Sequence, residues 1–154
     1  MSAEVENRYL CEQLRLNMDA AVRLLRASAR ALERQDTRLA RAVLEFDAAP
    51  QPGMRPLPQA ARADAMVEMV VDLAMRAAEL ARVAWRPGAA EPAQGDVAAL
   101  VEQLTEVADV AGCTGCRDLG SAPALAQTIR RTDAVAAGLL RQSEARRAAL
   151  CLAS

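Results

Sequence analysis

Histidine and lysine are both missing from this 154-residue sequence, so all nineteen of its basic residues are arginine. Without histidine there can be no Ser-His-Asp or Cys-His catalysis, and without lysine there is no Schiff-base amine and no P-loop lysine. No glycine-rich phosphate loop is present in their place. The composition therefore predicts a protein that is not an enzyme.

Aromatic residues are almost absent as well, because the chain holds one Tyr, one Phe and one Trp. Alanine, leucine and valine must then build the core through aliphatic contacts, which favours packed helices over a sheet sandwich. The length suits one domain. We expect a single all-α domain at 1–154, with a first half at 1–86, a linker at 87–95 and an incomplete second half at 96–154.

The chain also lacks a strong charge imbalance, since its formal net charge is −1. This argues against nucleic acid as a general partner, because phosphate neutralisation needs a basic excess. The N-terminus has no signal-peptide pattern, and no stretch of about eighteen residues is free of charge. We expect a cytoplasmic protein without a membrane span, in which the four cysteines are reduced thiols.

Apolar residues recur at intervals of three and four along most of the chain, which predicts amphipathic helices. Asp36, Asp96 and Ser121 are the expected helix N-caps. Proline and glycine break the helical pattern at 48–58 and at 86–95, so about five helical pieces remain. Their expected core-facing positions are Leu14, Met18, Ala21, Leu25, Ser28 and Leu32, then Val97, Leu100, Leu104, Val107 and Ala111, and finally Leu125, Ile129, Thr132, Ala136 and Leu139.

The segment 64–85 is apolar except for a narrow charged stripe. Its acids Glu68, Asp72 and Glu79 share one side of a helix, where carboxylate oxygens could bind a hard metal or iron. Alternatively, the stripe is the strip that a central helix leaves in water, with Arg76 as an ion-pair partner. The helical spacing of the charges favours this second interpretation.

Five arginines at helical spacing form a second candidate surface: Arg23, Arg26, Arg30, Arg34 and Arg38. The bidentate geometry of arginine suits phosphate groups or an acidic protein surface. The acidic segment 96–109 offers an alternative partner, either within the fold or across a dimer. A solvated or internally neutralised face is the favoured interpretation, because charge runs are usually of that kind.

Cys113 and Cys116 have the C-x-x-C spacing of redox and metal sites. A zinc ion would need two further ligands, which could come from Cys11 and Cys151 or from another subunit. A thiol redox switch is the other functional alternative. Two small residues packed in a tight helix bend are the favoured interpretation, since free cysteine packs as a small hydrophobe. We therefore expect no cofactor, with iron or zinc as the alternatives to test.

A weak internal repeat appears when the chain is shifted by 86 residues against itself. The segment ALERQDTRLARAVLEFD at 31–47 and its echo SAPALAQTIRRTDAVAAGLL at 121–140 resemble a helix pattern of the PhoU family of phosphate-transport regulators. MRAAELA at 75–81 is similar to that family's E-R-x-G-D-L-A segment. The resemblance implies a PhoU-like antiparallel helical bundle of two related halves.

The family's metal-binding acidic pair would fall on Met75 and Glu79, so one carboxylate is lost, and the last helix of the second half is missing. The resemblance therefore implies a regulatory or adaptor protein whose partner is a phosphate transporter or sensor kinase. An incomplete bundle would leave an apolar face open, and large open faces usually mark interfaces. We expect a homodimer, another homo-oligomer or a complex with a partner protein.

Overall fold

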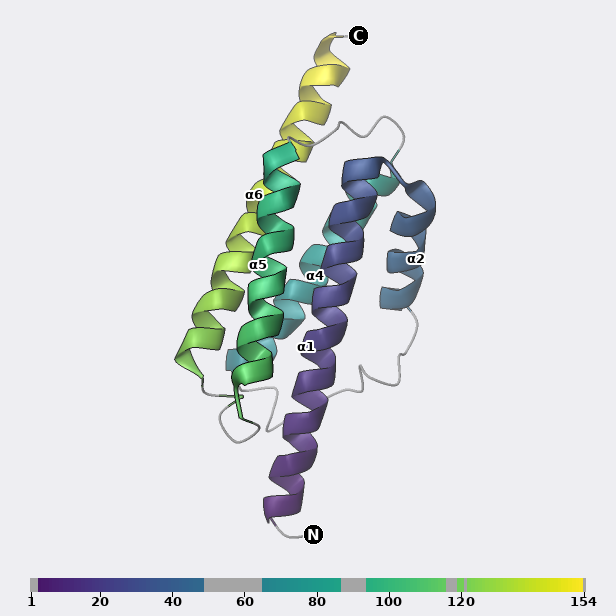
Figure 1. The fold of residues 1–154 in the computed structure, drawn as a ribbon. Coiled ribbons are helices and arrows are strands. Elements are labelled where there is room, and N and C mark those ends of the chain that lie inside the picture. Colours follow the sequence, from purple (N-terminus) through teal and green to yellow (C-terminus); the bar gives the residue numbers. More distant parts are fainter. Residues whose placement is uncertain (1–2, 49–64, 87–93, 116–118, 121, 154) are drawn as a thin grey trace.

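The computed structural model describes residues 3–48, 65–86, 94–115, 119–120 and 122–153, and these form α-helices without a strand (Figure 1). The predicted all-α bundle is confirmed. None of the described helices is long and apolar enough to cross a membrane. The helices are α1 (Ala3–Arg34), α2 (Thr37–Ala48), α4 (Ala65–Trp85), α5 (Gln94–Cys113) and α6 (Pro123–Ala153).

Helix α4 is the central element of the bundle. It packs against α1, α2 and α6, whereas α5 packs against α1 and α6. The four helices α1, α4, α6 and α5 thus close a ring, and the short α2 packs on α1 and α4. Consecutive helices alternate in direction, so α1, α4 and α6 run one way while α2 and α5 run the other (Figure 1).

The apolar faces of α5 and α6 are covered by this ring. The expectation of an open face rested on the helix that the second half lacks. Instead, α5 packs on α1 and α6 packs on α4, which removes the inner faces of both helices from water. Large exposed apolar side chains in the described part of the chain are therefore distributed over several helices: Val5, Tyr9, Leu16, Phe46, Val71, Met75, Trp85, Leu150 and Leu152.

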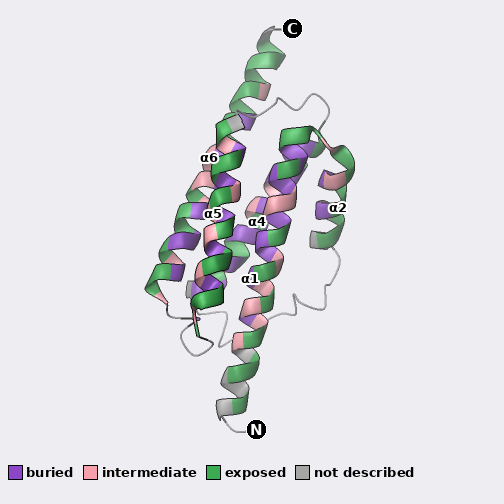
Figure 2. Ribbon diagram, viewed as in Figure 1, coloured by how far each residue is buried: buried purple, intermediate pink, exposed green. Residues whose placement is uncertain are grey.

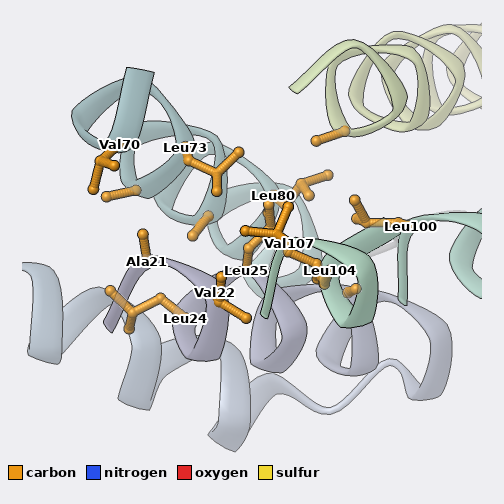
Figure 3. Close-up of a cluster of buried hydrophobic side chains, with 14 of the residues drawn as sticks. Ala21, Val22, Leu24, Leu25, Val70, Leu73, Leu80, Leu100, Leu104 and Val107 are labelled. Carbon is orange, nitrogen blue, oxygen red and sulfur yellow. The ribbon is translucent and has the colours of Figure 1, made fainter. Parts of the chain in front are cut away.

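The core forms along the seams that the helical periodicity predicted. Every core-facing position expected in α1, α5 and α6 from Leu14 onward is buried, and Figure 2 shows the buried positions on the inner sides of the helices. Leucine and valine from α1, α4 and α5 interdigitate at the centre (Figure 3). Aliphatic contacts thus supply most of the burial that stabilises the fold.

A one-residue hinge separates α1 from α2. Gln35 has a φ of 52°, in the left-handed region, and the Asp36 amide donates to the Ala31 carbonyl at 2.9 Å, as in a Schellman helix ending. The Asp36 side chain then accepts from the Leu39 amide at 3.1 Å. The N-cap predicted at Asp36, where a second helix begins, is confirmed.

Two predicted helix starts differ from the structure. Helix α5 begins at Gln94, so Asp96 lies in its first turn and is not its N-cap; an acid there still interacts favourably with the helix dipole. Helix α1 begins at Ala3, well before the apolar seam that indicated it. Ser121, most of the 48–58 loop and residues 87–93 of the expected linker lie outside the described residues.

Candidate functional site

One side of the central helix α4 remains in water. Glu68 and Asp72 are exposed there, and beside them lie the two most exposed apolar side chains of α4 before its end, Val71 and Met75, at 51% and 56%. We call these four residues the α4 strip. The rest of the helix girth is buried against α1, α2 and α6, so the interpretation of the charged stripe as a solvated strip is confirmed for these positions.

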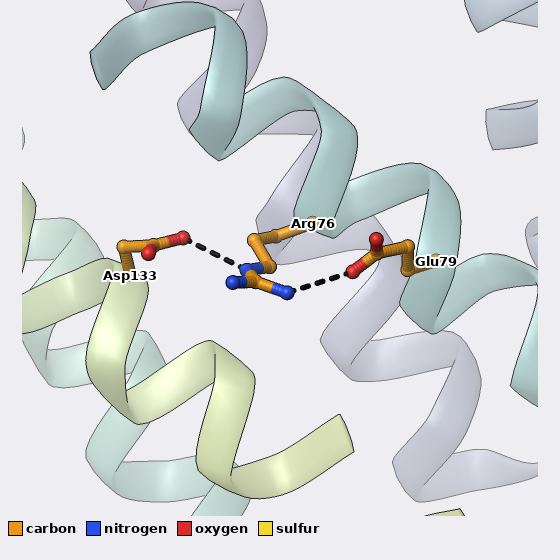
Figure 4. Close-up of polar contacts among 3 residues, drawn as sticks. All are labelled: Arg76, Glu79 and Asp133. Carbon is orange, nitrogen blue, oxygen red and sulfur yellow. Dashed lines mark hydrogen bonds and ion pairs between the residues drawn. The ribbon is translucent and has the colours of Figure 1, made fainter. Parts of the chain in front are cut away.

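Arg76 joins α4 to α6 at the edge of this strip (Figure 4). Its Nε donates to Asp133 Oδ1 and its Nη1 donates to Glu79 Oε2, both at 3.0 Å. The three side chains are each about one-third exposed. The hydrogen bond to Asp133, and then that to Glu79, raise the pKa of Arg76 above its ordinary value against the opposing effect of burial. The guanidinium therefore stays charged and pairs with both acids.

This pairing bears on the metal hypothesis for Glu68, Asp72 and Glu79. Glu79 is held by Arg76, whereas Glu68 and Asp72 extend into solvent. Within the described ranges, no three side chains of the histidine, cysteine, aspartate or glutamate type gather closely enough to hold a metal ion. Met75 lies between these acids as an exposed apolar side chain. What the arrangement offers is a mixed acidic and apolar contact surface.

The five arginines of the second candidate surface lie on the outer side of α1 and at the start of α2. Arg26 is half-buried and the other four are exposed; we call the set Arg23, Arg26, Arg30, Arg34 and Arg38 the arginine surface. In the part of the chain that the structure describes, none of these guanidinium groups lies within 4.0 Å of a carboxylate. The acidic segment of α5 therefore does not neutralise them within the chain.

The arginine surface and the α4 strip lie on opposite sides of the α1–α4 pair. On the inner side of α1, the buried Ser28 hydroxyl lies 2.7 Å from the Ala77 carbonyl oxygen of α4. On each helix the exposed residues are displaced by about half a turn from this contact. Because α1 and α4 pack directly on each other, the arginine surface lies on one outer face, where Asp19 and Glu33 are also exposed, and the α4 strip lies on the other.

Cys11 is disulfide-bonded, so the expectation of four reduced thiols is wrong for this residue. Cys113 and Cys151 are exposed, and neither is in a disulfide. Cys113 is the last residue of α5, and Cys116 lies outside the described residues.

Arg15 is a structural contact that the sequence did not indicate. From α1 it donates through Nη1 to the Ala111 carbonyl at 3.2 Å and through Nη2 to the Thr114 carbonyl at 3.0 Å. These acceptors lie at the C-terminal end of α5, where carbonyls lack partners within the helix and a cation is favoured. Arg15 therefore positions α5 against α1 and is not available to a ligand.

Comparisons of the chain with protein-family models, with curated proteins and with solved structures find no significant match.

Proposed function

We propose that this protein is a non-catalytic regulatory or adaptor protein that binds an acidic region of a partner protein through its arginine surface. The observation that carries the proposal is a set of neighbouring guanidinium groups without carboxylate partners in the described part of the chain. Elsewhere an exposed arginine does find an acid on its own helix, as Arg41 does with Glu45 at 3.0 Å. The arginine surface has donors to offer to another molecule.

The helix arrangement supports the more specific proposal of a PhoU-type role in phosphate uptake and signalling. Helices α1, α2 and α4 pack on one another as a three-helix unit, which is what the resemblance implies for one half of the family fold. The internal repeat also agrees with the helix starts, because α2 begins at Thr37 and α6 begins at Pro123, 86 positions later. On this proposal the partner is a phosphate transporter or its sensor kinase.

The test is a titration of this protein with the source organism's phosphate sensor kinase and, separately, with the nucleotide-binding subunit of its phosphate transporter. Replacing Arg26→Glu and Arg30→Glu should weaken binding at least about tenfold, roughly 1.4 kcal/mol, because two cations become repulsive anions. The matched control is Arg130→Glu with Arg131→Glu on α6, which makes the same charge change at exposed positions. Equal weakening by both double variants, or no binding of either partner, would contradict the proposal.

A second candidate function, a thiol-disulfide switch, is favoured by the disulfide at Cys11. Dithiothreitol would reduce this bond to two thiols and is itself oxidised to a cyclic disulfide, so the electrons balance. We expect reduction of the disulfide to change the affinity for the partner. The Cys11→Ser variant should show the affinity of the reduced protein, with or without dithiothreitol. Identical affinities for the oxidised and reduced protein would exclude the switch.

A further inference from the structure

We propose that the arginine surface of one molecule binds the α4 strip of a second copy of the same chain. The two surfaces are complementary in charge, since one presents guanidinium groups and the other presents Glu68 and Asp72 around an apolar centre. In the described part of the chain, the side chains of Glu68 and Asp72 have no ion pair and no hydrogen bond. Both surfaces are therefore free to form intermolecular pairs.

The spacing of the two surfaces also matches. The interval from Arg23 to Arg34 equals the interval from Glu68 to Glu79, and both span about 16 Å of helix. When α1 of one copy lies parallel to α4 of another, Arg23 faces Glu68 and Arg34 faces Glu79, whose carboxylate also accepts a hydrogen bond from Arg76 of its own chain. Each pair then brings opposite charges together along the contact.

The middle of the same arrangement is apolar. In this register Arg26 faces Val71 and Arg30 faces Met75. The methylene stems of arginine pack well on apolar side chains while their guanidinium ends reach a nearby carboxylate, which here is Asp72. Burial of Val71 and Met75, each more than half exposed in the single molecule, would add a hydrophobic contribution to the ionic one.

The symmetry of the contact follows from the fold. Helices α1 and α4 run in the same direction within the molecule (Figure 1), and their outer sides face opposite ways. A neighbouring copy can therefore dock by a sideways displacement without reversing its orientation. Such a contact joins two different surfaces, so each molecule of a pair keeps one surface that the contact does not use. Further copies can bind there, and the contact therefore builds rows or rings of molecules and not a closed two-fold dimer.

Self-association of this kind would have a regulatory consequence, which rests on the proposed function. Each contact covers one arginine surface, so a second copy competes with an acidic partner for the same guanidinium groups. Because a single pair of helices is at the small end of interface sizes, the contact should be weak and should depend on protein concentration. The inference about self-association itself does not depend on which partner the protein binds.

Sedimentation velocity on the purified full chain tests the inference without any partner. From about 10 μM to about 1 mM protein, the average mass should increase progressively past that of a dimer, and raising the salt from about 50 mM to about 500 mM should reverse the increase by screening. Two variants should each stay monomeric: Arg23→Glu with Arg30→Glu, and Glu68→Arg with Asp72→Arg. The control Glu102→Arg with Asp109→Arg, at exposed positions of α5, should associate as the unchanged protein does.

Mixing the two non-associating variants gives the decisive result. Each repels itself, but each carries charges complementary to those of the other, so an equimolar mixture should recover the association of the unchanged protein. Circular dichroism before mixing establishes that both variants are folded. A mixture that stays monomeric, or single variants that associate normally, would overturn the inference. If the protein does not self-associate but still binds its partner, the proposed function stands. If it self-associates but does not bind the partner, only the proposed function is contradicted.

Discussion

At the residue scale, Arg76 shows how one side chain can connect local and distant parts of the chain. Its pairing with Glu79, three positions along the same helix, is the kind of contact that helical spacing predicts. Its pairing with Asp133 on α6 depends on how α4 and α6 pack, and nothing in the spacing of either segment indicates it. Ion-pair partners on the same helix were therefore predictable from the sequence, whereas partners that helix packing brings together were not.

The Arg76–Asp133 contact gives a first prediction. Asp133→Asn should lower the free energy of unfolding by about 0.2–1 kcal/mol, because the pair is partly solvated and its attraction is screened. Urea unfolding of Asp133→Asn, Arg76→Gln and the double variant completes a double-mutant cycle. The two single changes should not add up, and strict additivity would show that the contact contributes nothing to stability.

The buried leucines give a second prediction at the same scale. Leu80 is fully buried on α4, so Leu80→Ala should lower the free energy of unfolding by about 2–5 kcal/mol through lost transfer energy and a residual cavity. The matched control is Val71→Ala on the exposed side of the same helix, which should change stability by no more than about 0.5 kcal/mol. Similar losses of unfolding free energy for both variants in chemical denaturation would contradict the assignment of Leu80 to the buried side of α4 and of Val71 to its exposed side.

At the scale of elements, the hinge between α1 and α2 is decided by two residues. Gln35 adopts the left-handed conformation that ends α1, and Asp36 caps α2 through its side chain. The cap at Asp36 was predicted from the sequence because a helix end is a local event, whereas the left-handed conformation of Gln35 was not. Thr114, the residue that follows α5, is different, since its contact with Arg15 depends on a neighbour far away in the chain.

The cap of α2 gives a third prediction. Asp36→Ala should lower the free energy of unfolding by about 0.5–2 kcal/mol, because the Leu39 amide loses its acceptor. Asp36→Ser should retain most of the stability, since a serine hydroxyl can accept the same hydrogen bond. Thermal unfolding followed by circular dichroism measures both, and a serine variant as unstable as the alanine variant would assign the effect to charge and not to capping.

At the scale of the whole molecule, the core seams were predicted from periodicity alone, but their pairing was not. Periodicity identifies the inner side of a helix, as at Leu100 and Leu125, without identifying the helix that covers it. The structure places α5 on α1 and α6 on α4 and so covers a face that was expected to remain open. The outer side of α1 carries the arginine surface together with the exposed acids Asp19 and Glu33, and the outer side of α4 carries the α4 strip together with the exposed Arg82.

The central claim is that the arginine surface is the place where a partner protein binds. Amide hydrogen exchange of this protein, alone and with the sensor kinase or transporter subunit it binds, tests that claim most directly, at a dilution low enough to suppress self-association. The account predicts that added protection concentrates in the second half of α1 and the first turn of α2, from Arg23 to Arg38. Protection confined to α5 or α6, with exchange in that region unchanged, would contradict it.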